Sequence, residues 1–202
     1  VFKDSDSGGT VYQGDPNTSQ ATVAMSSWLS NIAAALPDRA SPAIWISFLL
    51  MGSTSEANGF IDPENRRRFI TQVVDFANRH NLTGVDIDWE FPSGAAQWES
   101  YERLVEELGA ALHANGKYLS SAVARWASMS LSGTGLNKLD RVLIMAYDNL
   151  STDGQHSTFS SSAVDALKEA LNQKGVAPEK VYLGIPWYGA YATNISKLIN
   201  WK

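Results

Sequence analysis

Residues 82–92, LTGVDIDWEFP, alternate apolar and acidic side chains. This alternation is typical of a β-strand with one buried face, and its acidic positions are Asp86, Asp88 and Glu90. Alternate residues of a strand share a face and lie roughly 6.5–7 Å apart, so all three carboxylates point the same way. At an effective dielectric of 20, two such charges repel each other by about 2.5 kcal/mol. A strand that only builds a core has no use for this cost, so the pattern predicts a functional site.

Strand and helix patterns alternate around this stretch, from about residue 42 onward. Continuous apolar runs predict further buried strands over 42–50, 118–124, 141–147 and 181–187. Apolar residues at helical spacing predict helices over 21–36, 62–80, 97–114 and 161–174, whereas residues 1–20 are rich in turn formers and predict loop. The alternation predicts β-α-β units and a parallel sheet, either a (β/α)8 barrel or a doubly wound sheet. No glycine-rich phosphate motif follows a strand, which disfavours the nucleotide-binding version of the second fold.

Composition excludes several classes of protein. The 202 residues carry a net charge of −5, which argues against a nucleic-acid binder. The absence of cysteine excludes a disulfide framework and a thiolate zinc site. No run of 18 apolar residues exists that could span a membrane. Seven tryptophans are an unusually large number, and flat aromatic rings are suitable surfaces for sugars, although core packing explains most tryptophans individually.

Polar and aromatic residues lie where several predicted strands end. In parallel α/β folds, reactive side chains gather at the carboxyl ends of the strands. Glu90 lies at such an end, just before Phe91 and Pro92. The candidates at the other strand ends are Tyr147, Asp148, Trp187 and Tyr188. We therefore expect these strands to deliver their side chains to one rim.

Repulsion within the carboxylate cluster has a chemical consequence. It raises the pKa of at least one member, because ionised neighbours disfavour deprotonation. A carboxylic acid that is protonated near neutral pH is what protonation of a glycosidic oxygen requires. A magnesium site is the competing interpretation, since aspartates also cluster around that ion. No histidine lies close in the sequence, and we expect neither a metal nor a cofactor.

Three motifs, in the same order and at similar spacing, resemble glycoside hydrolase family 18, the chitinase family. GVDIDWEFP (84–92) is similar to the family signature Asp-Gly-x-Asp-x-Asp-x-Glu. MAYD (145–148) resembles its Met-x-Tyr-Asp strand, and LGIPWYG (183–189) its Gly-x-Pro-x-Tyr-Gly strand. The resemblance covers about residues 42–192 and implies a (β/α)8 TIM barrel.

The resemblance also implies a retaining mechanism in which the substrate's own acetamido group is the nucleophile. Glu90 would protonate the leaving oxygen, Asp88 would orient the acetamido group, and Asp86 would set the charge state of Asp88. Tyr147 would donate a hydrogen bond to the acetamido carbonyl. The candidate substrate-binding residues are Ser47, Trp89, Trp126, Asp148, Trp187 and Tyr188. Tyr147 as a core residue, Trp187 and Tyr188 as rim packing, and Trp126 as an ordinary loop aromatic remain alternatives.

The sequence departs from the family pattern at two places. Thr83 replaces the first aspartate of the signature, which is expected to shorten the acidic ladder and to shift the pKa of Asp86. In SFLLMGS (47–53), Ser47 matches a family serine, but Leu49 and Leu50 occupy positions where the family has small residues. These large side chains would crowd the sugar site, unless the alignment shifts toward Gly52.

The chain is short for a closed barrel. Five strands are evident where a barrel needs eight and usually about 250 residues. We therefore expect residues 1–202 to be one catalytic barrel domain that is only partly present. Flanking segments or a second subunit would complete it, and the isolated 202-residue chain is expected not to be a stable active monomer.

The leading hypothesis is a secreted enzyme that cleaves β-1,4-linked N-acetylglucosamine in chitin or chitooligosaccharides. An endo-β-N-acetylglucosaminidase acting on N-glycans would use the same chemistry, but the Tyr147–Asp148 pair favours chitin. A non-catalytic chitin-binding lectin of the same fold is the alternative from another class. Retention of Glu90 argues against the lectin, whereas Thr83, Leu49 and Leu50 argue mildly for it.

Overall fold

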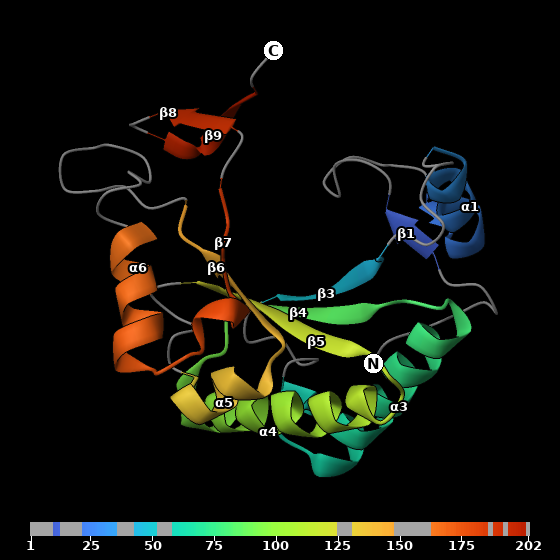
Figure 1. Ribbon diagram of the computed structural model, residues 1–202, viewed down its shortest axis with the longest axis horizontal. Coiled ribbons are helices and arrows are strands. Elements are labelled where there is room, and N and C mark those ends of the chain that lie inside the picture. Colours follow the sequence, from blue (N-terminus) through green and yellow to red (C-terminus); the bar gives the residue numbers. More distant parts are fainter. Residues whose placement is uncertain are drawn as a thin grey trace.

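A five-stranded parallel sheet forms the centre of the molecule (Figure 1). The computed structural model describes residues 10–12, 22–35, 43–51, 58–124, 131–147, 163–185, 188–191 and 194–200. The strands are β3 (Trp45–Met51), β4 (Gly84–Glu90), β5 (Tyr118–Ala124), β6 (Arg141–Met145) and β7 (Val181–Leu183). They lie side by side in chain order, without the reversal that defines a doubly wound sheet. The order is that of a (β/α)8 barrel wall, which confirms the predicted fold class for these five strands.

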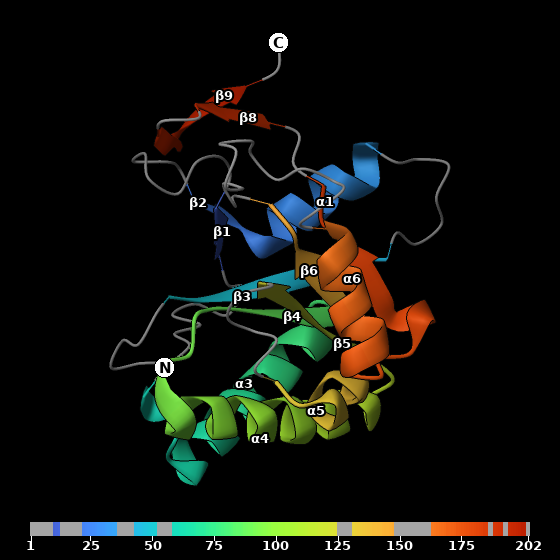
Figure 2. The same cartoon turned by 90° about the vertical axis from the view of Figure 1, so that its left-hand side faces the viewer.

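Helices between consecutive strands cover one face of this sheet (Figures 1 and 2). They are α3 (Pro63–Arg79), α4 (Gly94–His113), α5 (Gly133–Lys138) and α6 (Val164–Lys168). After α6 the chain continues as a π-helical turn, η3 (Glu169–Gln173), and a short 3-10 turn, η4 (Pro178–Lys180). Within the described residues, no helix is both long enough and apolar enough to cross a membrane.

Smaller elements lie outside the parallel sheet. Strand β1 (Thr10–Tyr12) pairs antiparallel with β2 (Thr22–Ala24), which leads directly into α1 (Met25–Ala35). Near the other end of the chain, β8 (Tyr188–Tyr191) pairs antiparallel with β9 (Asn194–Asn200). The stretch 1–20, predicted as mostly loop, contains β1, and the helix predicted over 21–36 begins at Met25, four residues late. Both short strands have β-branched residues, which suit an extended backbone, and they are too short to show a period of two.

Two predicted strands of the parallel sheet are shorter than expected. The strand predicted over 141–147 ends at Met145, because the backbone N–H of Ala146 turns back to the carbonyl of Ile144 at 3.1 Å. The strand predicted over 181–187 ends at Leu183. The backbone N–H of Gly184 still donates to the Ile144 carbonyl at 2.8 Å, which keeps the two strand ends together.

Local sequence explains where α3 begins and which side it buries. Asp62 caps the helix by accepting a hydrogen bond from the backbone N–H of Glu64 at 2.7 Å, and Pro63 occupies the first helical position. Asn81 follows the last turn in the left-handed region, with a φ of 50°. The buried apolar stripe of the helix consists of Phe69, Ile70, Val73, Phe76 and Ala77. These features confirm the helix predicted over 62–80.

The hydrophobic core lies between the sheet and its helices. Strand β4 contributes Val85, Ile87 and Trp89, each at most 1% exposed. Helix α4 packs against them with residues that are completely buried, namely Tyr101, Leu104, Val105, Leu108 and Leu112. Burying one such side chain contributes about 1.5–3 kcal/mol, so this packing fixes β4 in place. The alternate residues of β4 therefore face away from the helices.

The face of the sheet without helices is concave. The Cζ atom of Arg141 on β6 lies 4.6 Å from the ring centroid of Trp45 on β3 and 5.4 Å from that of Tyr182 on β7. Strands β3 and β6 are separated by two others, so this contact requires a sheet that curls toward this face. A Cβ atom on Gly84 would lie 2.5 Å from the Trp45 ring, which explains the glycine at the start of the acidic strand.

Candidate functional site

The three carboxylates of β4 lie together on the concave face. Asp86, Asp88 and Glu90 occupy alternate positions of a seven-residue strand whose other face is buried under α3 and α4. Asp86 is buried, and Asp88 and Glu90 are half-buried. The predicted acidic row on one face of a strand is therefore present.

Asp86 is held by two serine hydroxyls, one from each neighbouring strand. Ser47 of β3 donates to Oδ2 at 2.7 Å, and Ser120 of β5 donates to Oδ1 at 2.6 Å. The register explains the arrangement, because Ser47, Asp86 and Ser120 lie opposite one another across three strands. Both carboxylate oxygens therefore accept a hydrogen bond in a buried place.

Only one of these two serines was identified as a site residue from the sequence. Ser47 was expected among the substrate-binding residues, but its hydroxyl is engaged by Asp86, so it supports a carboxylate. Ser120 was not identified from sequence. Its signal was the pair Ser120–Ser121 in an otherwise apolar strand, but only the register with β4 shows which of the two faces the acids.

Asp88 has different neighbours. Leu49 of β3 and Ala122 of β5 lie opposite it in the register, so neither adjacent strand offers a donor. Its Oδ1 atom is buried without a hydrogen-bond partner among the described residues. Burial, followed by the negative charges of Glu90 and Asp86, raises the pKa of Asp88 to about 7. The prediction of a raised pKa in this cluster is confirmed, although loss of solvent contributes more than repulsion does.

Glu90 is the last residue of β4, at the carboxyl end of the strand. Its register partner is Met51, the last residue of β3. The peptide bond between Glu90 and Phe91 is cis, and Pro92 follows as a buried residue. Glu90 thus lies at the rim where a barrel enzyme binds its substrate.

Tyr147 lies just beyond β6, half-buried, and packs over Gly184 at the end of β7. A Cβ atom on Gly184 would approach Cε1 of the tyrosine ring to 2.7 Å, so the glycine makes room for that ring. Trp126, Asp148 and Trp187 lie outside the described residues. The backbone of Tyr188 begins β8, but its side chain is not among those described.

The expectation that Trp89 binds substrate is wrong. Trp89 is completely buried on the helix side of β4, opposite the carboxylates. Its ring centroid lies 5.7 Å from that of Phe60 and 5.2 Å from that of Tyr101, so the indole is a core residue. An odd-numbered residue of this strand cannot share a face with the even-numbered acids.

Thr83 lies immediately before β4, and its hydrogen bonds join it to the start of β3. The Thr83 hydroxyl accepts a hydrogen bond from the backbone N–H of Ile44 at 3.1 Å, and its own N–H donates to the Ile44 carbonyl at 2.8 Å. Thr83 therefore aligns the starts of β3 and β4, and its presence leaves the three carboxylates intact.

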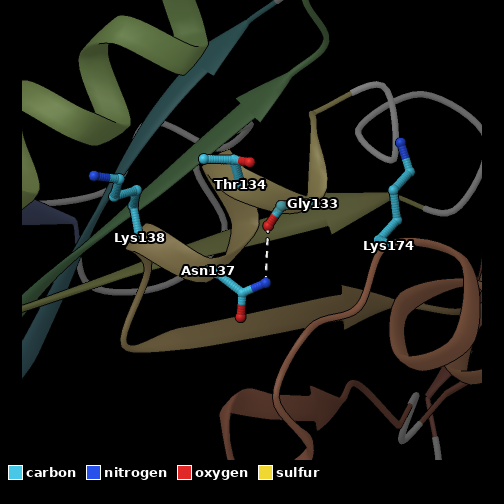
Figure 3. Close-up of a pocket in the computed structure, with 5 residues that line it drawn as sticks. All are labelled: Gly133, Thr134, Asn137, Lys138 and Lys174. Atoms are coloured by element: carbon cyan, nitrogen blue, oxygen red, sulfur yellow. Dashed lines mark hydrogen bonds between the residues drawn. The ribbon is translucent and has the colours of Figure 1, made fainter.

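Two pockets in the described part of the chain lie away from Glu90. One, of about 510 Å³, is lined by Gly133, Thr134, Asn137, Lys138 and Lys174 (Figure 3). Its polar groups are engaged locally: the Asn137 amide donates to the Gly133 carbonyl, and the Lys174 ammonium to that of Leu131, both at 2.9 Å. The other, of about 250 Å³, lies where the strands begin and is lined by Trp45, Thr83, Tyr118, Asp140 and Arg141. In the same described residues, no three acidic or histidine side chains are arranged to hold a metal ion.

Comparison with known proteins gives a consistent group of relatives. The family model described as "Glycosyl hydrolases family 18" matches residues 30–200. "Probable endochitinase" from Caenorhabditis elegans is 31% identical over 162 residues, which are 67% of this chain and 26% of that protein. "Probable chitinase 2" from Drosophila melanogaster is 30% identical over 166 residues, 73% of this chain and 34% of that protein.

Solved structures agree with the sequence relatives. The GH18 chitinase ChiB from the chitin utilization locus of Flavobacterium johnsoniae has a TM-score of 0.66 at 30% identity, covering 82% of this chain and 55% of that chain. A mutant GH18 chitinase from Cycas revoluta in complex with (GlcNAc)4 has a TM-score of 0.63 at 26% identity, covering 81% and 54%. The chain thus matches a quarter to a third of the two curated relatives and just over half of the two solved chains.

Proposed function

This chain belongs to glycosyl hydrolases family 18, and on that premise we propose that it cleaves β-1,4-linked N-acetylglucosamine in chitin or chitooligosaccharides. The observation that carries the proposal is the environment of Asp88. Asp88 has a pKa of about 7. It lies between Asp86, whose carboxylate is fixed by two hydroxyls, and Glu90 at the end of the strand. Three acids arranged in this way can share and release a proton near neutral pH.

In the proposed reaction, Glu90 is the general acid. It gives its proton to the glycosidic oxygen as the bond from that oxygen to the anomeric carbon breaks. The acetamido oxygen of the same sugar forms the new bond to the anomeric carbon, giving an oxazolinium ion. Water then attacks that carbon and gives a proton back to Glu90, so the anomeric configuration is retained. No side chain forms a covalent bond to the sugar.

Asp88 and Asp86 have supporting roles in this proposal. A carboxyl group with a pKa near 7, and with one oxygen that has no partner among the described side chains and backbone, can turn toward the acetamido N–H, accept its hydrogen bond and stabilise the cationic ring. Burial and the charge of Glu90 favour a proton on Asp88, and Asp86, held by Ser47 and Ser120, adds a smaller contribution of the same sign. Tyr147 would donate its hydroxyl to the acetamido carbonyl, and Asp148 would help to hold the sugar.

The relatives support the substrate class. The worm protein is named "Probable endochitinase" and the fly protein "Probable chitinase 2", and the structure from Cycas revoluta contains (GlcNAc)4. An enzyme that degrades chitin meets its polymer outside the cell, so we also propose that the whole protein is secreted.

Replacing Glu90 by glutamine in the full-length protein tests the proposal. The change keeps shape and hydrogen bonding but removes the transferable proton, so turnover of a fluorogenic chitobioside should fall by about 100-fold or more. Binding to chitin beads should persist. A variant that keeps more than about a tenth of wild-type turnover would exclude the acid role of Glu90. Loss of activity in EDTA with recovery in magnesium would instead favour the metal site.

A non-catalytic chitin-binding protein is the second candidate, and Leu49 favours it. This side chain is 54% exposed on the concave face, in register with Asp88, at a position where a small residue would leave space for a sugar. The decisive observation is a wild-type protein that binds chitin beads but releases no product from the chitobioside. Turnover that appears only in the Leu49→Gly variant would identify Leu49 as the residue that blocks hydrolysis.

A further inference from the structure

We propose that Asn58 and Gln97 are positioning residues for Glu90, through two hydrogen bonds of the buried Gln97 amide that join the segments following β3 and β4. The inference rests on the proposed function, because it assigns these residues to the orientation of the proposed acid. Neither residue is adjacent in the chain to a carboxylate of β4, and neither belongs to the motifs identified above.

Gln97 lies in the first turns of α4 and is only 3% exposed. Its Oε1 atom accepts the backbone N–H of Ser93 at 2.7 Å, and its Nε2 atom donates to Oδ1 of Asn58 at 2.7 Å. Ser93 is the N-cap residue of α4 but makes no side-chain capping bond. The Gln97 side chain therefore closes the turn that begins immediately after Glu90, at residues 91–93.

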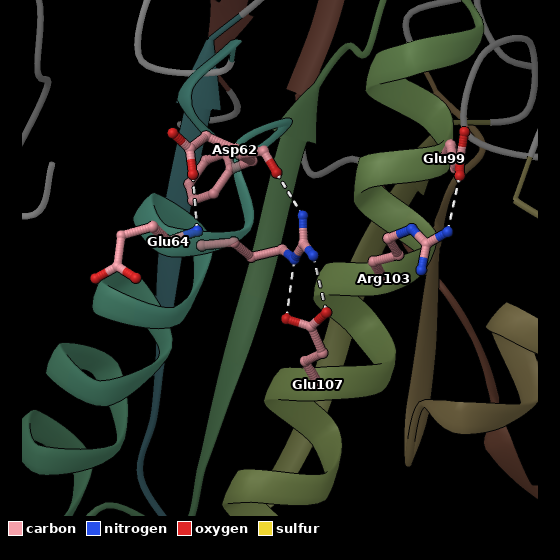
Figure 4. A network of polar contacts seen from close by, with 7 residues as sticks. Asp62, Glu64, Glu99, Arg103 and Glu107 are labelled. Carbon is pink, nitrogen blue, oxygen red and sulfur yellow. Dashed lines mark hydrogen bonds and ion pairs between the residues drawn. The ribbon is translucent and has the colours of Figure 1, made fainter.

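Asn58 belongs to a turn, residues 58–61, that is itself firmly held. The Ile61 N–H donates to the Asn58 carbonyl at 3.1 Å, and Arg66 donates through Nη1 to the Phe60 carbonyl at 2.8 Å. Arg66 is 4% exposed and makes a bidentate ion pair with Glu107 of α4, at 2.9 Å for both bonds. Figure 4 shows the Glu107 carboxylate on α4 at the end of this pair. The turn is thus an anchored partner for Gln97.

Packing below the strand connects the same turn to the acid. The Phe60 ring is 6% exposed and lies 5.7 Å, centroid to centroid, from Trp89, the residue before Glu90. The backbone of Glu90 therefore has a fixed turn on its helix side and a segment tied by Gln97 on its carboxyl side. A general acid must lie within hydrogen-bond reach of the leaving oxygen, and displacement of about 1 Å can cost 100-fold in rate.

The test compares two substrates with each variant of the full-length protein. A chitooligosaccharide has a sugar hydroxyl as its leaving group and needs proton donation, whereas a dinitrophenyl chitobioside has a leaving group that departs with little protonation. Asn58→Ala and Gln97→Met should lower turnover of the chitooligosaccharide by about tenfold or more but that of the dinitrophenyl substrate by less than about threefold. The KM values should stay close to wild type, and Asn58→Asp, which keeps the acceptor oxygen, should restore turnover.

Asn78→Ala is the matched control. The Asn78 amide donates to the Asn115 side chain at 3.0 Å, joining the ends of α3 and α4 on the opposite rim of the sheet. Removing it breaks the same type of bond without approaching Glu90, and both substrates should be affected equally. The ratio of the two activities does not depend on how much of the protein is folded, so a partly unfolded variant remains informative.

Two results would overturn the inference in distinguishable ways. A wild-type protein that hydrolyses neither substrate would remove the proposed function and the inference with it. An active wild type whose Asn58→Ala and Gln97→Met variants lose both activities in parallel would retain the proposed function. In that case Gln97 only caps a helix.

Discussion

The two faces of β4 are built from alternate residues of one seven-residue strand, yet they obey different rules. On the helix side, Val85, Ile87 and Trp89 are at most 1% exposed, and core packing alone explains the choice of these residues. On the concave side, three acids lie in a row, and one of them has a buried oxygen atom with no hydrogen-bond partner in the part of the chain that the structure describes. The residues of the first face stabilise the fold, whereas part of the acidic row on the second face destabilises it. Such a destabilising cluster is typical of a functional site.

The concave face itself contains two kinds of position. The row across Ser47, Asp86 and Ser120 supplies two side-chain donors to its carboxylate, whereas in the next row the neighbours of Asp88, Leu49 and Ala122, have no side-chain donor. A shift of two residues along one strand therefore exchanges a hydroxyl environment for an apolar one. The two aspartates are expected to contribute to stability with opposite signs near neutral pH.

The largest expected effect contrasts the two faces directly. Trp89→Ala removes a completely buried indole that contacts Phe60 and Tyr101, and should lower the free energy of unfolding by about 3–5 kcal/mol. Leu49→Ala, on the concave face at 54% exposure, should change it by less than about 0.5 kcal/mol. Urea denaturation of the full-length protein measures both. Equal losses would mean that both faces are buried in the complete protein.

The second effect concerns the satisfied aspartate. Asp86→Ala leaves the hydroxyls of Ser47 and Ser120 without their acceptor, and hydrogen bonds to a charged group contribute about 1.5–3 kcal/mol. We expect a loss of about 2–3 kcal/mol, measured by the same denaturation curves. A stabilised Asp86→Ala variant would show that repulsion, and not hydrogen bonding, dominates at this position.

Alternation of residue types in the sequence was sufficient to predict which residues of β4 share a face. The Asp62–Pro63 pair likewise located the start of α3, because capping chemistry is local. The error at Trp89 arose where the family motif was considered without strand parity, since Trp89 is odd-numbered on a strand whose acids are even-numbered. In these cases the information was present in the sequence.

Other features of the site depend on contacts between distant parts of the chain and could not be predicted from the sequence. Ser120 supports Asp86 only because β5 pairs with β4 in one register, and a slip of one residue would place Ser121 there instead. The bond between Gln97 and Asn58 joins residues 39 apart in the chain, which no local pattern indicates. The pKa of Asp88 depends on the apolar residues opposite it, which belong to two other strands.

A smaller effect separates the two serines that hold Asp86. Ser120 is 2% exposed, so Ser120→Ala removes a buried charge-assisted bond and should cost about 1.5 kcal/mol. Ser47 makes the equivalent bond from an exposed position, where water can replace the hydroxyl, and Ser47→Ala should cost about 0.5 kcal/mol. Thermal unfolding of the two alanine variants side by side gives the difference. A larger cost at Ser47 would show that its side chain is covered in the complete protein.

The last prediction uses pH to isolate Asp88, whose pKa is raised from 3.8 to about 7 in the folded protein. Between about pH 4 and pH 7 the folded state keeps a proton that the unfolded state releases, so this group lowers stability as pH rises through that window. Asp88→Asn resembles the neutral acid at every pH and does not have this dependence. Its advantage over wild type in unfolding free energy should therefore grow across the window and level off above pH 7, at about 1 kcal/mol once solvent screening of the half-buried carboxylate is allowed for. Urea denaturation at several pH values gives the curve, with Asp75→Asn, an exposed acid on α3, as the control for removing a surface charge. A difference between Asp88→Asn and wild type that is flat from pH 4 to pH 8 would mean that Asp88 ionises as freely as in the unfolded chain. The apolar neighbours of Asp88 would then have no effect on its proton.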